Sequence, residues 1–207
     1  MADTDLTLIN AALTRSGNNP ISALDGNDSV AAIVANQNYE LVVKAELARS
    51  RFKLPSKFQQ LSLIDEDELG EPPAPWQYGY TLPSDLVKLR TIKVNGAPIA
   101  FAQMGRIIYC DYDNTNPVIA EYLWRIPESW FAPEFALGII LRMEAVFRRA
   151  ISEQHAEADE RDAAADDQLR FAATSDAQAQ TPQDPVLAPT LNARTGVVSS
   201  TLRARRA

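Results

Sequence analysis

Apolar residues recur at every fourth position between residues 131 and 151, and this spacing predicts a helix with a broad apolar face. The stripe consists of Phe131, Phe135, Ile139, Met143, Phe147 and Ile151, widened by Ala136, Ile140, Val146 and Ala150. Its polar sector is narrow, essentially Arg142 and Arg149. A helix that is apolar around so much of its circumference needs packing partners on more than one side. We therefore expect the rest of the chain to cover it.

A second helix is expected immediately downstream, where alanines are interleaved with aspartates and glutamates from about residue 156 to residue 173. This composition has a high helix propensity, and its small apolar side chains allow two helices to approach closely. The two segments predict an antiparallel helix pair, broken near residues 153–156, as the core of the fold.

Two more helices are predicted before residue 50. The first is marked by Leu6, Ile9, Ala12 and Leu13, begins after Asp3 or Thr4 and stops at Gly17. The second runs from Asn27 or Asp28 to Ala48. Its expected apolar side consists of Val30, Ile33, Val34, Gln37, Leu41, Ala45 and Ala48. We expect this side to cover the helix at residues 131–151.

The segment between the helices, residues 51–125, has the pattern of extended structure. Asn95-Gly96 is the strongest hairpin signal in the chain, with a strand at residues 86–94 before it and a partner strand at 99–103. A second hairpin is expected from residues 106–110, a turn at 111–116 and residues 118–124. The predicted fold class is α+β: a mainly α-helical bundle with an inserted small antiparallel β-hairpin sheet and an extended C-terminal arm.

The boundaries of these parts follow from changes in composition. Residues 1–50 and 126–180 form the helical domain, residues 51–125 the inserted β-rich domain and residues 181–207 the arm. The arm contains three prolines and too little apolar area to fold alone, yet its apolar residues are regularly spaced. A segment of this kind usually becomes ordered on a partner.

Composition and charge exclude several classes of protein. The chain has 207 residues, 46% of them hydrophobic, and no run long enough to span a membrane. Its acidic first residues are unlike a signal peptide, and the single cysteine, Cys110, excludes an internal disulfide. The net charge of −7 argues against a general nucleic-acid binder and instead gives a surface that repels DNA.

Catalytic and metal-binding signals are weak, and no cofactor is predicted. His155, the one histidine, is expected to be solvated at a helix start, and zinc spacing and phosphate-binding glycine loops are absent from the sequence. Residues 111–116 resemble a calcium loop superficially but lack Gly at the sixth position and an acid at the twelfth, where Tyr122 stands. A hairpin turn is the better interpretation.

Two further groups of side chains have alternative interpretations. The aromatic residues Trp76, Tyr78, Tyr80, Tyr122, Trp124, Trp130 and Phe131 are expected to cluster where the sheet meets the helices rather than to stack on nucleobases. The basic arm could bind an acidic or mixed protein surface, which we place first because coupled folding would also use its apolar residues, or DNA, or nothing.

Several of these short patterns together resemble a known family. They are the opening segment Leu8-Ile9-Asn10-Ala11-Ala12-Leu13 with Gly17, Pro20-Ile21 and a helix containing Tyr39, then Trp76-x-Tyr78-x-Tyr80-x-Leu82-Pro83-x-Asp85 with Leu89-Arg90, and finally Tyr122-x-Trp124 before a long helix. In this order they resemble the head-to-tail adaptor (connector) proteins of tailed bacteriophages, specifically the tail tubular protein A-like branch of short-tailed phages. The resemblance covers roughly residues 6 to 180. The chain departs from the family at Arg51-Phe52, where a tryptophan is often found.

The resemblance implies a structural virion protein without catalytic activity, located at the neck of the virion and assembled in the host cytoplasm. Family members form a ring, usually of twelve subunits, between the portal protein and the tail nozzle or tube, and DNA passes through the ring without sequence-specific binding. A neighbouring subunit would cover part of the helix at residues 131–151. Tail fibres or spikes are further possible partners, and no membrane is involved.

The resemblance also assigns two groups of contact residues. The portal-binding arm would use Leu191, Arg194, Val197, Val198, Leu202, Arg203, Arg205 and Arg206. Tail-facing or inter-subunit loops would contain Asp65, Glu66, Asp67, Glu68, Asp111 and Asp113.

Two hypotheses of other classes stay open. One is a tail-associated hydrolase of polysaccharide or cell wall, with the acids at positions 65–68 as acid and base. The other is a regulatory module whose arm docks on DNA through Arg203, Arg205 and Arg206.

Overall fold

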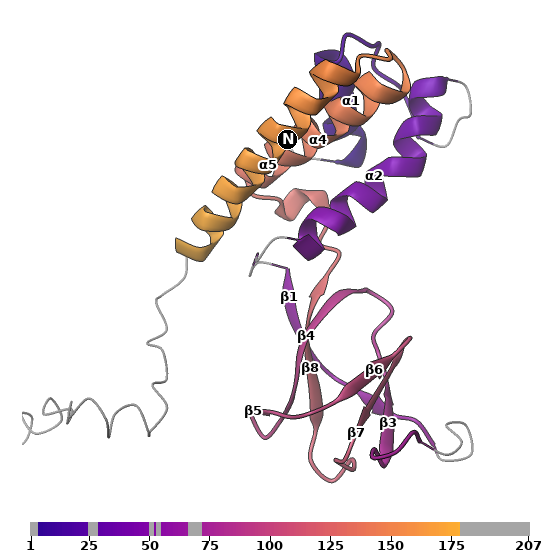
Figure 1. The fold of residues 1–207 in the computed structure, drawn as a ribbon, viewed down its shortest axis with the longest axis vertical. Coiled ribbons are helices and arrows are strands. Elements are labelled where there is room, and N and C mark those ends of the chain that lie inside the picture. Colours follow the sequence, from indigo (N-terminus) through magenta and orange to yellow (C-terminus); the bar gives the residue numbers. More distant parts are fainter. Residues whose placement is uncertain (1–3, 25–28, 50–51, 53–54, 66–71, 179–207) are drawn as a thin grey trace, which may run out of the picture. The chain divides into compact units, whose positions relative to one another are not determined.

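The computed structural model describes residues 4–24, 29–49, 52, 55–65 and 72–178. By its contacts the chain divides into two units, residues 1–177 and 178–207. The helices and strands of the first unit are shown in Figure 1 and give an α+β fold, as the sequence predicts. The predicted arm at residues 181–207 lies outside the described residues.

Four α-helices are present in the described part of the chain: α1 (Asp5–Arg15), α2 (Val30–Arg49), α4 (Pro133–Ala150) and α5 (His155–Gln178). Local signals place the ends of α1 where the sequence predicts them. The hydroxyl of Thr4 accepts a hydrogen bond from the backbone N–H of Thr7 at 3.2 Å, and Gly17 follows the helix with a positive φ of 79°. A short 3₁₀ helix, η1 (Glu128–Trp130), precedes α4.

Helices α4 and α5 form the predicted antiparallel pair. Gln168 on α5 donates to the carbonyl of Glu134 near the start of α4, whereas Arg149 at the end of α4 pairs with Asp159 near the start of α5. The two helices are separated at residues 151–154, where Glu153 has a positive φ of 54°. The helical core contains the apolar stripe from Phe131 to Phe147, so the predicted burial of this stripe is confirmed. Phe131 itself lies in extended backbone before the start of α4, which begins later than predicted.

The residue that lets α4 and α5 pack closely is Gly138. A Cβ atom at this position would lie 2.6 Å from both Cγ and Cδ2 of the buried Leu169 on α5. We expect Gly138→Ala to lower the free energy of unfolding by about 1 kcal/mol, because overpacking of about 1–3 kcal/mol exceeds the helix-propensity gain of about 1 kcal/mol. Urea unfolding measures this change, and in a Leu169→Ala background the same substitution should be tolerated. A stabilised Gly138→Ala protein would contradict this packing.

The orientation of α2 differs from the prediction. Its buried residues are Ala32, Ala35, Tyr39, Val43, Glu46 and Leu47, whereas Val30 and Leu41 of the predicted covering side are 61% and 67% exposed. At 100° per residue the two sets lie on opposite sides of the helix. The expectation that the Val30 and Leu41 side covers α4 is therefore wrong. The start of α2 also lies later than predicted, since the hydroxyl of Ser29 accepts from the backbone N–H of Ala32.

Among the residues that the structure describes, eight strands form two four-stranded antiparallel sheets. They are β1 (Ser56–Gln60), β2 (Ser62–Leu63), β3 (Tyr78–Thr81), β4 (Leu86–Val94), β5 (Ala97–Pro98), β6 (Ala102–Met104), β7 (Ile107–Cys110) and β8 (Val118–Trp124). One sheet has the order β1-β8-β4-β5 and the other β2-β3-β7-β6. A second apolar core, which includes Tyr80, Ile92, Ile108 and Tyr122, is built by strands of both sheets.

The first predicted hairpin is confirmed at its turn but not along its whole second strand. Asn95 and Gly96 both have positive φ, at 51° and 80°, as the two-residue turn requires. However, the strand that pairs with β4 is the short β5. The next strand, β6, belongs to the other sheet, where it pairs with β7. The predicted partner at residues 99–103 is thus split between two sheets.

The second predicted hairpin is wrong in its pairing. Strands β7 and β8 form close to where they are expected, but β7 pairs with β3 and β6, whereas β8 pairs with β1 and β4. The turn at residues 111–116 therefore joins two sheets. Asp113 accepts hydrogen bonds from the backbone N–H and the hydroxyl of Thr115, which fixes this turn locally without specifying the partner of either strand.

Among the described helices, none is both long enough and apolar enough to cross a membrane.

Candidate interaction surfaces

The outer side of α2 carries an apolar stripe that other described residues cover only in part. We call it the outer stripe of α2, and it consists of Val30, Val34, Gln37, Leu41, Ala45 and Ala48. Val30 and Leu41 are largely exposed, and Gln37 and Ala45 are exposed. Ala48 is half-buried, and the half-buried Val34 packs against the edge of the helical core. Because the opposite side of α2 is buried in the helical core, this helix is apolar on two sides, of which its own chain covers one.

The inner side of α2 is held by a polar contact as well as by apolar packing. The hydroxyl of Tyr39, in the middle of the helix, donates to a carboxylate oxygen of Glu128 at 3.2 Å, and burial raises the pKa of Tyr39 above its usual value. Arg125 pairs with both Glu128 and Glu40, so the same network includes the outer flank of α2. These contacts fix which side of α2 faces the core.

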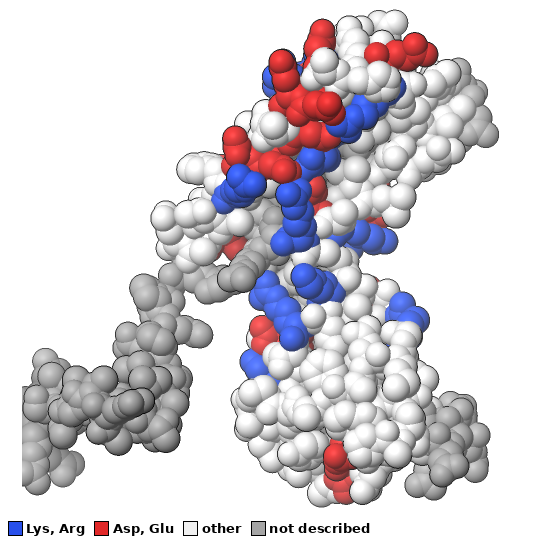
Figure 2. Space-filling model, in the orientation of Figure 1, with Lys and Arg blue, Asp and Glu red and all other residues white. Residues whose placement is uncertain are grey.

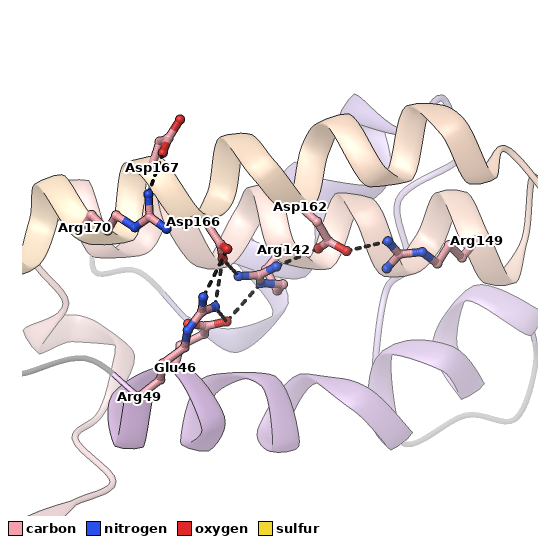
Figure 3. Close-up of polar contacts among 8 residues, drawn as sticks. All are labelled: Glu46, Arg49, Arg142, Arg149, Asp162, Asp166, Asp167 and Arg170. Carbon is pink, nitrogen blue, oxygen red and sulfur yellow. Dashed lines mark hydrogen bonds and ion pairs between the residues drawn. The ribbon is translucent and has the colours of Figure 1, made fainter.

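A second network, shown in Figure 3, connects α2, α4 and α5 through Arg142. Its guanidinium donates to Glu46 on α2 at 2.9 Å, to Asp162 on α5 at 2.8 Å and also to Asp166. Arg49 on α2 binds both carboxylate oxygens of Asp166, at 2.8 and 3.1 Å. Figure 2 shows acidic and basic side chains mixed over the helices, and further basic side chains over the β-rich part. Arg142, predicted as part of the polar sector of α4, is thus a bridge between three helices.

A third polar contact site lies around Glu144, which is only 2% exposed. Its carboxylate accepts from Arg148 on α4 and from Arg15 on α1, and Arg161 on α5 lies 3.2 Å away. A buried carboxylate surrounded by cations in this way keeps its charge compensated. Together with Arg142, it anchors α1, α2 and α5 to α4.

The pKa of Asp166 reflects these contacts. Hydrogen bonds from Arg49 and Arg142 lower the pKa of Asp166 to about 2, although partial burial opposes the change. A carboxylate whose pKa is lower in the folded than in the unfolded protein stabilises the fold above the unfolded pKa of about 3.9, and this contribution disappears as the pH falls toward 2.

We therefore expect Asp166→Asn to reduce the free energy of unfolding most above about pH 5 and progressively less as the pH falls to about 2. Urea unfolding at several pH values between 2 and 6 measures this difference. Asp167→Asn is the matched control, because Asp167 forms only an exposed ion pair with Arg170. A penalty for Asp166→Asn that does not change over this pH range would contradict the assignment.

The predicted loop acids are placed as follows. Asp65 is exposed just after β2, and Asp111 and Asp113 are exposed between β7 and β8. Asp65 and Asn114 line one shallow depression, so the two predicted loops lie on the same side of the β-rich part. Glu66, Asp67 and Glu68 fall outside the described residues. So do the predicted arm residues Leu191, Arg194, Val197, Val198, Leu202, Arg203, Arg205 and Arg206.

The residues considered for catalysis or metal binding lie on separate elements. His155 is exposed at the first position of α5, and Cys110 is buried in β7, where burial raises the pKa of its thiol. In the part of the chain that the structure describes, His, Cys, Asp and Glu side chains form no group of three that could hold a metal ion.

The aromatic residues lie in three places rather than in a single cluster. Tyr80 and Tyr122 are buried in the core of the β-rich part, and Phe131 is buried in the helical core. Trp124 and Trp130 pack edge to face with ring centroids 5.8 Å apart where β8 leads into η1. Because Tyr80, Tyr122 and Phe131 lie in the two cores and Trp124 and Trp130 contact each other at the joint, the expectation of a single aromatic cluster is wrong.

Sequence reasoning missed two exposed aromatic side chains, Phe58 on β1 and Phe171 on α5, which are 61% and 60% exposed. Phe58 lies between polar residues in a strand that the sequence indicated only as extended structure, and Phe171 follows an acidic helical segment. For Phe58 the available signal was its position between the polar residues Lys57 and Gln59. No family model and no curated protein matches the sequence.

Proposed function

We propose that this chain is the subunit of a head-to-tail adaptor of a tailed bacteriophage, a structural virion protein that forms a homo-oligomeric ring between the portal and the tail nozzle or tube. The observation that carries the proposal is the outer stripe of α2, around Val30 and Leu41, which is apolar and open in the single chain. An apolar helix side of this kind is typical of a surface that another subunit covers.

A ring requires a head-to-tail contact, in which one surface of a subunit meets a different surface of the next. The outer stripe of α2 would supply one of these two surfaces. In this proposal the neighbouring subunit contacts α2 rather than α4, because α1, α2 and α5 of the same chain already surround α4. The proposed ring would continue the DNA channel of the portal, with usually twelve subunits by analogy with the family.

The charge of the chain fits this role. A net charge of −7 gives a surface that repels DNA, which is useful where DNA must pass without binding. Helix α5 contributes strongly, with seven acidic residues and two arginines. In this proposal the protein has no catalytic turnover and is located in the neck of the virion.

The arm and the loops would make the contacts with other virion proteins. Residues 179–207 contain four arginines and only one acid, Asp184, in a sequence with regularly spaced apolar residues. In this proposal the arm binds the portal protein, and the loops with Asp65, Asp111 and Asp113 face the tail nozzle or tube, or the fibres or spikes. Both assignments rest on the family resemblance.

Deleting residues 181–207 tests the portal contact. Because both apolar cores are formed by residues before 174, we expect the truncated chain to stay folded and soluble but to lose binding to portal rings in co-sedimentation. The full-length chain is the control. Portal binding at full strength by the truncated chain would contradict this part of the proposal.

A further inference from the structure

Strand β1 is an open edge of its sheet. It pairs with β8 on one side, and in the described residues no strand lies on its other side. The backbone N–H of Leu61 donates to the carbonyl of Val118, and that of Trp124 donates to the carbonyl of Pro55. In an antiparallel pair hydrogen-bonded residues alternate, so Lys57 and Gln59 also bond to β8. The N–H and C=O groups of Ser56, Phe58 and Gln60 therefore point away from the sheet.

The surroundings of this edge are suited to an added strand. The side chain of Phe58 is exposed, with the ammonium group of Lys93 over its ring at 5.4 Å, and Gln59 and Gln60 are exposed beside it. Two shallow depressions meet at residues 60–62, one extending toward Leu82 and Pro83 and the other toward Asp65. Neither a proline nor an outward-pointing charge protects residues 58–60 against pairing.

We propose that residues 195–202 of a neighbouring copy add to β1 as an antiparallel strand. The segment reads Thr-Gly-Val-Val-Ser-Ser-Thr-Leu, and its four β-branched residues make it the run in residues 179–207 with the highest strand propensity. Strand addition uses backbone hydrogen bonds for affinity and side-chain contacts for register. The inference rests on the proposed ring, since it requires neighbouring copies side by side.

The charge of Arg194 favours the antiparallel direction. The 16 residues before the segment are long enough for it to reach a neighbouring subunit. Antiparallel pairing with β1 brings Arg194, just before the segment, to the side of Asp65, whereas parallel pairing would separate these two charges. The 16 residues from 179 to 194 can span up to about 50 Å when extended, which is enough to reach an adjacent subunit. Arg203, Arg205 and Arg206 would then leave the far end of β1 and stay available for the portal.

The arm would thus have two parts with different partners. Val197, Val198 and Leu202 would hold the neighbouring subunit, and the arginines that follow would bind the portal. The ring would then be closed both by the outer stripe of α2 and by exchanged strands, so that portal binding and ring closure support each other.

Disulfide trapping between two full-length chains tests the inference. One chain carries Gln60→Cys and the other carries Val197→Cys, Val198→Cys or Ser199→Cys, while the native Cys110 is buried and stays in place. When the two chains are mixed with oxidised glutathione, we expect a covalent heterodimer on non-reducing gels. Met104→Cys replaces Gln60→Cys in the control, because Met104 is exposed on β6, an edge of the other sheet.

A further pair of variants separates edge pairing from random collision. Phe58→Pro removes an outward N–H without removing a bond to β8, whereas Phe58→Thr keeps that N–H, so only the proline should reduce the heterodimer, by about tenfold. Equal trapping with Met104→Cys, or disulfide-linked homodimers of the Gln60→Cys chain without any heterodimer, would overturn the inference. Portal binding without the heterodimer would overturn it and leave the adaptor function standing.

Discussion

Replacing Leu41 with aspartate is expected to weaken self-association at least a hundredfold while leaving the folded chain intact. Leu41 is 67% exposed in the middle of the outer stripe of α2, so a charge there meets solvent in the single chain but would be buried in the ring. Burying an unpaired carboxylate costs at least about 3 kcal/mol, which corresponds to this loss in affinity. Sedimentation velocity over a range of concentrations measures the change.

Met104→Asp is the matched control for this substitution. Met104 is also a large exposed apolar residue, at 51%, but it lies on β6 and away from α2. We expect Met104→Asp to assemble like the unaltered chain, with both variants showing the same circular dichroism. If Leu41→Asp assembles as well as Met104→Asp, the outer stripe of α2 is not a subunit interface.

Replacing Arg142 with methionine is expected to lower the free energy of unfolding by about 3 kcal/mol. Methionine keeps most of the apolar stem but removes the guanidinium that bridges Glu46, Asp162 and Asp166. Glu46 is 6% exposed, so its carboxylate would stay buried with much of its charge compensation lost. Urea unfolding followed by tryptophan fluorescence measures this loss.

Arg170→Met is the control, because Arg170 forms only an exposed ion pair with Asp167 on the same helix. Exposed pairs of this type contribute about 0–1 kcal/mol, so the control should be nearly neutral. Similar losses for the two variants would mean that the Arg142 bridge does not connect the three helices energetically.

The helices α1, α4 and α5 could be predicted because their local signals agree with their surroundings. Apolar residues at every fourth position from Phe131 to Phe147 give α4 a broad apolar face, and the small alanines of α5 permit close helix packing. Thr4 and Gly17 mark the ends of α1 through contacts within a few residues. The positions of such helices depend little on contacts with residues far away in the sequence.

The orientation of α2 could not be predicted because the helix is apolar on both sides. Periodicity identifies a stripe, but two opposite stripes, one with Leu41 and one with Val43, satisfy it equally well. The choice is made by contacts far along the chain, such as the hydrogen bond from Tyr39 to Glu128. The stripe that we expected inside is therefore the outer surface, and this is what makes it a candidate interface.

Strand positions were more predictable than strand partners. The alternation and the Asn95-Gly96 turn defined β4, and β7 and β8 lie near their expected residues. Their partners are set by long-range closure of a core around Tyr80 and Tyr122, to which neighbouring turns contribute no information. The open edge at β1 could not be anticipated for the same reason.

The mass of the full-length chain in solution, alone and then mixed with portal rings of a tailed bacteriophage, tests the proposed adaptor function most directly. Light scattering after size-exclusion chromatography gives both values. The proposal predicts a complex of one portal ring with one ring of this chain, in equal subunit numbers if both rings have twelve subunits. No association at any salt concentration would contradict it and would return the hydrolase and DNA-docking hypotheses to first place.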